Sequence, residues 1–163
     1  MPIVSAIDEN PEIDGRQSEE AMLVRRGIIK GMAAYNMVFL PELTLKTGRR
    51  ADLVALDDKG LIIIFEIKSS IADFQSDTKW DEYKPFCDKF YFATHPDVPK
   101  EIFPKTEGFI LADKFGCEVI REAEIHKLSA PTRKALTLRF ARTAAKRIKR
   151  LTLQEQFVET LEK

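Results

Sequence analysis

Three charged residues stand in apolar segments that have the composition of central β-strands. Asp52 lies in the run Ala-Asp-Leu-Val-Ala-Leu, and Glu66 and Lys68 close the run Leu-Ile-Ile-Ile-Phe-Glu-Ile-Lys. Central strands rarely carry ionisable side chains, because a buried charge needs an opposite charge or a metal ion. Side chains alternate along a strand, so Glu66 and Lys68 share one face. These three residues are therefore the first candidates for chemistry.

The turn between the two runs sets their register. The tripeptide Asp58–Gly60 has the pattern of a three-residue hairpin loop with glycine in the left-handed conformation. Asp57 then pairs with Leu61, and counting back along the ladder places Asp52 opposite Glu66. Directly opposed residues share a face, with Cβ atoms about 5 Å apart. The sequence thus predicts two carboxylates and one lysine in a single cluster.

Two carboxylates this close repel each other unless a cation lies between them. Mg²⁺ prefers carboxylate oxygens and keeps several waters, so Mg²⁺ or Mn²⁺ is the expected guest of Asp52 and Glu66. Such a cation lowers the pKa of a bound water and polarises a phosphoryl oxygen, while Lys68 orients the water or stabilises charge on the phosphate. The cluster predicts metal-dependent cleavage of phosphodiesters. The alternative is a purely structural ion network at the end of a sheet.

The rest of the sequence predicts the elements that position this cluster. Ser18, followed by Glu19 and Glu20, starts a helix that runs to about residue 35, in which Gly27 and Gly31 indicate close packing. Strands are predicted at 37–46, 49–57, 61–68, 89–94, 108–112 and 117–121, and further helices at 70–84, 131–150 and 152–162. The first three strands form an antiparallel meander. This order predicts an α/β (α+β) fold with a mixed central sheet flanked by helices.

Composition predicts a soluble protein. The chain has 163 residues, of which 44% are hydrophobic and 32% charged, with no net charge. This indicates one domain over residues 16–163, with its C-terminal helices at 131–163, after a flexible arm over residues 1–15. No apolar run is long enough for a bilayer, and the N-terminus lacks a secretion-signal pattern, so we expect a cytoplasmic protein with no membrane partner. Cys87 and Cys117 are expected as reduced thiols.

Basic residues are concentrated near the end of the chain. Between Leu128 and Arg150 there are eight bases and no acid. At 100° per residue, Leu136, Phe140, Ala144 and Ile148 form an apolar stripe, and an opposite face carries Arg139, Arg142, Lys146, Lys149 and Arg150. This basic face is either solvated or a contact surface for a phosphate backbone. One of Arg49 and Arg50, just before Asp52, is expected to face the cleft and contact phosphate.

Several motifs together resemble a known family. Asp52 followed by Glu66-Ile67-Lys68 is similar to the PD-(D/E)XK nuclease pattern, with Ala51 where that pattern has proline. The closer resemblance is to the MmcB-like DNA-repair endonucleases of bacteria. It rests on Gly48-Arg-Arg-Ala-Asp-Leu, Glu66-Ile-Lys-Ser-Ser, Ala72-Asp-Phe, Lys79-Trp-Asp-Glu-Tyr, Cys87-Asp-Lys-Phe-Tyr-Phe-Ala-Thr and Arg133-Lys-Ala-Leu-Thr-Leu-Arg-Phe-Ala-Arg.

The resemblance implies a restriction-endonuclease-like αβββαβ core, a divalent metal ion and DNA as the substrate. By resemblance, Asp52, Glu66 and the backbone carbonyl of Ile67 bind the metal, and Lys68 is the catalytic lysine. A glutamate of the first helix often completes such sites, and Glu19 and Glu20 are the candidates. The implied function is a metal-dependent DNA endonuclease of DNA repair. The alternative is a nuclease-fold subunit that docks on DNA without cleaving it, and a homodimer or a repair-protein partner stays open.

Further candidates surround the cluster. Lys79 and Tyr83 are spaced i and i+4 in the predicted helix 70–84, which makes Lys79 an auxiliary group for the scissile phosphate or a solvated lysine beside a packing tyrosine. Trp80 is expected in the core, with stacking on a base as the alternative. Glu42 is a further acid near the Arg49-Arg50 side, and simple exposure is its expected state.

Overall fold

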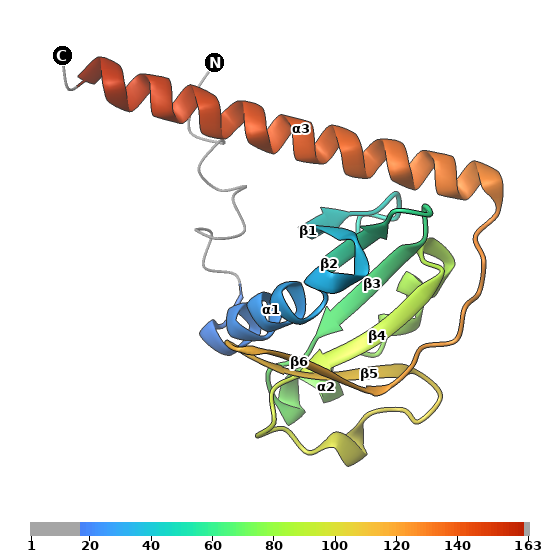
Figure 1. Ribbon diagram of the computed structural model, residues 1–163. Coiled ribbons are helices and arrows are strands. Elements are labelled where there is room, and N and C mark those ends of the chain that lie inside the picture. Colours follow the sequence, from blue (N-terminus) through green and yellow to red (C-terminus); the bar gives the residue numbers. More distant parts are fainter. Residues whose placement is uncertain (1–16, 162–163) are drawn as a thin grey trace.

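A mixed six-stranded sheet forms the centre of the computed structural model, which describes residues 17–161 (Figure 1). Its strands are β1 (Met37–Thr44), β2 (Arg50–Asp57), β3 (Ile62–Ile67), β4 (Lys89–Thr94), β5 (Gly108–Asp113) and β6 (Gly116–Arg121), adjacent in sequence order. The β3–β4 and β4–β5 pairs are parallel and the other three are antiparallel. The predicted α+β class and the antiparallel meander of the first three strands are confirmed, whereas the arm at 1–15 lies outside the described residues.

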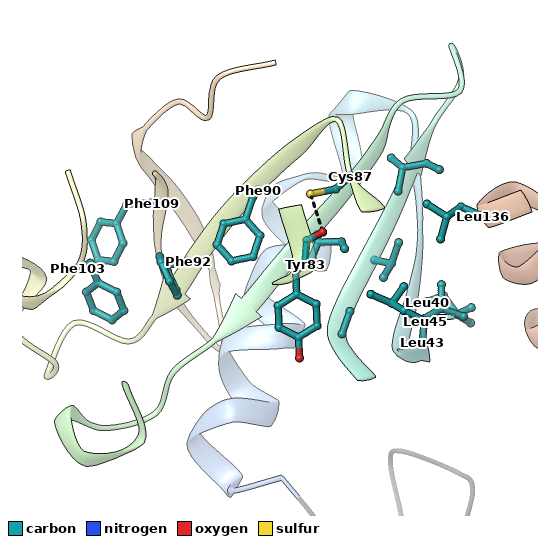
Figure 2. Packing of buried hydrophobic residues seen from close by; sticks show 14 of the residues in the cluster. Leu40, Leu43, Leu45, Tyr83, Cys87, Phe90, Phe92, Phe103, Phe109 and Leu136 are labelled. Atoms are coloured by element: carbon teal, nitrogen blue, oxygen red, sulfur yellow. Dashed lines mark hydrogen bonds between the residues drawn. The ribbon is translucent and has the colours of Figure 1, made fainter. Parts of the chain in front are cut away.

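Helices cover both faces of this sheet. They are α1 (Glu19–Gly31), α2 (Ile71–Ser76) and α3 (Ala130–Leu161), with the 3₁₀ segments η2 (Ala33–Tyr35), η3 (Trp80–Phe86) and η4 (Lys100–Ile102). One apolar layer joins α1 to the sheet, and a second, on the opposite face, joins the sheet to α2, η3 and α3. Figure 2 shows part of this second layer, with a row of phenylalanines beside Tyr83 and leucines near Leu136. The sheet is therefore the shared wall of two cores.

The first helix begins and packs as its sequence predicts. The Ser18 hydroxyl accepts a hydrogen bond from the Ala21 N–H at 3.2 Å, which caps the helix. A Cβ added at Gly27 would clash with the carbonyl oxygen of Asp113, and one at Gly31 with the side chain of Cys117. The two glycines thus let α1 approach the β5–β6 hairpin closely. Cys117 and Cys87 are free thiols, as predicted.

The predicted helix over 70–84 is wrong. The chain forms α2, breaks at Asp77 and resumes as η3. Asp77 has extended backbone angles (φ −92°, ψ 99°), and its Oδ1 accepts a hydrogen bond from the Lys79 N–H at 3.0 Å. This local side-chain bond competes with helix propagation, because aspartate offers the backbone an alternative partner. The consequence is that Lys79 and Tyr83 do not lie on one face of a common helix.

The two predicted C-terminal helices are one continuous helix of 32 residues. No glycine or proline interrupts it around Leu151, so no stop signal separates the two predicted segments. Leu136, Phe140 and Ala144 pack on the core as expected, but Ile148 is 64% exposed. The helix then extends beyond β1 (Figure 1). The large apolar side chains of residues 151–161 are exposed. None of the helices within residues 17–161 is long and apolar enough to cross a bilayer.

An ion pair between the half-buried Arg133 and the buried Asp88 fixes the start of α3. The Arg133 guanidinium donates to both carboxylate oxygens of Asp88, at 2.7 and 2.6 Å, and to the Gly60 carbonyl at 2.6 Å. Asp88 also accepts hydrogen bonds from the backbone N–H groups of Ile62 and Leu128. Burial alone would raise the pKa of Asp88, but these donors hold it below its usual value. The helix is thereby joined to the hairpin that sets the register of β2 and β3.

Candidate active site

The predicted register between β2 and β3 is confirmed. Leu53 pairs with Phe65 and Leu56 with Ile62, so the next step of the same ladder sets Asp52 across from Glu66. The turn has its expected geometry, because Gly60 has φ +85° and its N–H donates to the Asp57 carbonyl at 3.2 Å. The hairpin therefore brings the two acids together near one end of the sheet.

Asp52 is held by the opposite strand and by the start of α1. Its Oδ2 accepts a hydrogen bond from the Ile67 N–H at 2.8 Å, and the Gln17 amide approaches its Oδ1 at 3.5 Å. Gln17 is held in turn by Arg25, which donates to its Oε1 at 3.1 Å and is only 1% exposed. Burial raises the pKa of Asp52 to about 6, although the Ile67 N–H and Lys68 lower it.

Glu66 is buried with one carboxylate oxygen that has no hydrogen-bond partner among the described residues. Its Oε1 lies 3.3 Å from the Lys68 ammonium, whereas Oε2 is the atom without a donor. Burial, followed by repulsion from Asp52, raises the pKa of Glu66 well above its usual value. A buried polar atom without a partner requires an explanation, and an ion is one of the few available.

These residues fit a hard divalent cation. Two carboxylates face each other, and a buried oxygen lacks a donor, which is the donor set that Mg²⁺ or Mn²⁺ accepts. No cluster of three or more His, Cys, Asp or Glu side chains suited to a metal occurs within residues 17–161. An ion here would therefore depend on Asp52, Glu66, a backbone oxygen such as that of Ile67, and water.

The start of α1 contributes a residue that the sequence did not single out. Glu19 and Glu20 lie exposed on the first turn of the helix. Gln17, just before the capping Ser18, is the side chain that reaches Asp52. It carries no charge and lies outside the helix, so no sequence pattern distinguished it from an ordinary polar residue.

Lys68 is held by a second acid that the sequence analysis missed. Its ammonium lies 2.7 Å from Asp77 Oδ2, closer than its 3.3 Å to Glu66, and its side chain is almost fully buried. Its backbone is fixed on β4, because its N–H donates to the Ala93 carbonyl and its carbonyl accepts from the Thr94 hydroxyl. Asp77 lies within the helix predicted over 70–84, and nothing in that pattern distinguished it from the other polar residues of the segment.

Arg49 is the arginine that faces the cluster. Its guanidinium lies 3.7 Å from Asp77 Oδ1, 3.5 Å from Glu82 and 4.6 Å from the centre of the Tyr83 ring. The Tyr83 hydroxyl donates to the Arg50 carbonyl at 2.9 Å, and in Figure 2 it points out of the apolar layer. The tyrosine thus packs and braces β2, while Lys79 is exposed just before η3.

Arg50 pairs with Glu42, an acid that the sequence led us to expect at the surface. Its guanidinium lies 3.3 Å from Glu42 Oε1, and Glu42 is only 5% exposed, so the expectation of simple exposure is wrong. Glu42 adopts a left-handed backbone (φ +51°) inside β1. Trp80 packs against Phe90 and Phe92, with ring centroids 5.8 and 5.0 Å away, which places it in the core as expected.

The basic residues of α3 divide into two groups. Arg139 donates to the Thr44 carbonyl at 3.4 Å, and Arg147 donates to the carbonyls of Pro41 and Glu42. These two arginines cover the outer edge of β1, which would otherwise offer its carbonyls to another strand. Arg142, Lys146 and Lys149 are exposed, and Arg150 is partly buried. The exposed group is therefore the one available to an outside ligand.

Comparison with known proteins places this geometry in a family. The family model described as DNA repair protein MmcB-like matches residues 8–155. The chain belongs to the MmcB-like family. Membership indicates a role in DNA repair, and such a role implies interaction with DNA.

One solved structure extends the comparison to the fold. The chain is similar to the SPO1766 protein of unknown function from Silicibacter pomeroyi, with 34% sequence identity and a TM-score of 0.81. The match covers 85% of this chain and 95% of that chain. Among curated proteins, none matches the chain. The MmcB-like chain therefore shares its fold with a protein whose description assigns no activity.

Replacing Asp52 by Asn should stabilise the metal-free protein above pH 7. The pKa of Asp52 is raised to about 6 in the folded protein, so the parent loses stability as the pH rises from the unfolded-state pKa of about 4 to 6, and the full cost remains above that range. Asparagine keeps the acceptor for the Ile67 N–H. In urea unfolding with EDTA at pH 8, D52N should gain about 1–3 kcal/mol, and the gain should vanish below about pH 3, where the acid is protonated in both states. Asp58→Asn, in the exposed hairpin turn, is the control, and a D52N protein less stable than the parent at pH 8 would contradict the assignment.

Proposed function

We propose that this chain is a divalent-metal-dependent DNA endonuclease that acts in DNA repair. One observation carries the proposal: two carboxylates face each other on adjacent strands, one with a buried oxygen that lacks a donor, and a buried lysine lies beside them. A structural ion network would be expected to satisfy all of its buried oxygens. The unsatisfied oxygen favours a site that is completed by a ligand.

The metal is proposed to be Mg²⁺ or Mn²⁺, held by Asp52, Glu66 and the Ile67 carbonyl. When bound, the ion would supply charge that acidifies water and polarises a phosphoryl oxygen. The chain itself sets the geometry of the Asp52 ligand. The Ile67 N–H fixes Oδ2, whereas Oδ1 has only the long contact to the Gln17 amide. A bound cation would replace Gln17 as the partner of Oδ1. The contribution of Glu19 or Glu20 would require α1 to bring one of these exposed side chains inward.

Lys68 is proposed to act as a cation rather than as a base. Burial would lower its pKa, but Glu66 and Asp77 hold the pKa of Lys68 above its usual value. A lysine that keeps its proton at neutral pH can donate hydrogen bonds to a water or to a phosphate oxygen. Its role is therefore to orient the attacking water and to stabilise negative charge on the reacting phosphate.

DNA is the proposed substrate because of family membership and because of the exposed arginine and lysine side chains. The MmcB-like description names DNA repair. Arg49 stands beside the cluster, and Arg142, Lys146 and Lys149 are exposed on α3. Contacts of this kind position a phosphate backbone without reading its sequence.

Substitutions in the cluster should abolish cleavage. Asp52→Asn or Glu66→Gln removes a metal ligand, and Lys68→Met removes the cation, so each should lower kcat by at least about 100-fold while the protein stays folded. The assay compares duplex, single-stranded, flap and junction DNA with Mg²⁺ and with Mn²⁺, and D58N serves as the control. If the unaltered protein cuts none of these with either ion, it is not an endonuclease. DNA binding that needs no metal and survives Asp52→Ala would then favour the docking subunit.

The exposed basic residues of α3 should govern the salt dependence of DNA binding. Each lysine or arginine that neutralises a phosphate releases counterions, so the triple variant R142A/K146A/K149A should bind more weakly and lose about 2–3 from the slope of log K against log salt. Fluorescence anisotropy with labelled duplex between low and physiological salt measures this slope. The matched control replaces Lys100, Lys105 and Lys114 by alanine, and equal losses in the two triple variants would mean that α3 is not the contact surface.

A further inference from the structure

One carboxylate, that of Asp77, divides its two oxygens between two cations of the site. Oδ2 lies 2.7 Å from the Lys68 ammonium, and Oδ1 lies 3.7 Å from the Arg49 guanidinium. Lys68 in turn stands between two acids and is nearer to Asp77 than to Glu66, which is 3.3 Å away. Asp77 thus competes with Glu66 for a single buried ammonium group.

The chain is shaped locally to deliver this carboxylate. The α2 helix ends at Ser76, and the extended Asp77 is fixed by two bonds: its N–H donates to the Phe74 carbonyl at 3.2 Å, and its Oδ1 accepts from the Lys79 N–H. The sequence of 70–84 has helical spacing throughout, so the break is set by these contacts and not by a helix-breaking residue. A departure from local preference of this kind is expected where function requires it.

Without Asp77, the nearest anion to the Lys68 ammonium would be Glu66. An ammonium paired fully with Glu66 would occupy the carboxylate that a divalent cation needs and would oppose that cation by charge repulsion. In the structure the ammonium lies nearer to Asp77 than to Glu66 Oε1, and Glu66 Oε2 has no donor among the described residues.

We propose that Asp77 is a positioning residue that shares the Lys68 ammonium with Glu66 Oε1, and so keeps Glu66 Oε2 available to a divalent cation. The inference rests on the proposed function, because it assumes that Asp52 and Glu66 are the metal ligands. It goes beyond that function in assigning control of metal affinity to a residue that touches neither metal nor substrate. Arg49, on the other oxygen of Asp77, links this control to the side on which phosphate is proposed to bind.

The test measures Mn²⁺ binding to the full-length protein by isothermal titration calorimetry, without DNA. Asp77→Asn keeps the size of the side chain and the acceptor for the Lys79 N–H, but removes the charge that holds Lys68. We expect D77N to bind Mn²⁺ about tenfold more weakly than the parent, a loss typical of residues that orient metal ligands. In the double variant K68M/D77N the loss should disappear, because no ammonium is left to occupy Glu66.

Two controls separate this positioning role from others. Asp81→Asn removes an exposed acid of η3, close in sequence, and should leave affinity unchanged. Thermal unfolding of each variant checks that the fold is intact. Equal Mn²⁺ affinity of D77N and the parent would overturn the inference while leaving the proposed function standing. A loss that persists in K68M/D77N would also overturn it, because Asp77 would then act directly on the metal or on the fold. No Mn²⁺ binding by the parent would overturn both proposals.

Discussion

The site depends on holding two carboxyl groups close together, those of the half-buried Asp52 and the buried Glu66. Burial raises the pKa of both carboxyls, and for Glu66 the neighbouring Asp52 raises it further. One backbone N–H and one lysine offset part of this cost. The fold therefore carries a local destabilisation at this end of the sheet, which a bound cation would relieve. Carboxyl groups with raised pKa values cluster at functional sites, where the surrounding structure enforces an arrangement that isolated residues would avoid.

The β2–β3 hairpin, together with the contacts that brace this hairpin, holds the two acids in place. The tight turn at Asp58–Gly60 fixes the register, so that neither acid can move to the other face without shifting every pair of the ladder. Arg133 binds both the turn carbonyl of Gly60 and the buried Asp88, which joins the hairpin to the start of α3. The long helix then continues across β1, where Arg139 and Arg147 cover edge carbonyls. Arg133, Arg139 and Arg147 of this helix thus bind within the fold, whereas Arg142, Lys146 and Lys149 are exposed.

Much of this could be predicted because it is encoded locally. Alternation along the strands and the glycine in the turn were sufficient to place Asp52 opposite Glu66, and Ser18 was sufficient to start α1. The predictions that failed concern features that depend on contacts between distant segments. The break at Asp77 places its carboxylate against Lys68, and Glu42 is buried because Arg50 pairs with it. Helical or strand spacing in 70–84 and 37–46 contains no information about these partners.

The prediction of two separate C-terminal helices, where α3 is continuous, failed for a different reason. No stop signal separates 131–150 from 152–162, so the division reflected a change in composition rather than a helix end. Gln17 was missed because an uncharged side chain outside a helix gives no pattern at all. The cluster of Asp52, Glu66 and Lys68 was thus visible in the sequence, whereas the residues that position it were visible only in the fold.

The most direct test of the central claim is a crystal structure of the protein soaked in Mn²⁺, with anomalous scattering recorded to locate the ion. We expect one anomalous peak between the two strands, with carboxylate oxygens of both Asp52 and Glu66 within about 2.3 Å of it. A crystal that shows no peak there at saturating Mn²⁺, or an ion bound elsewhere while Glu66 stays paired with Lys68, would contradict it.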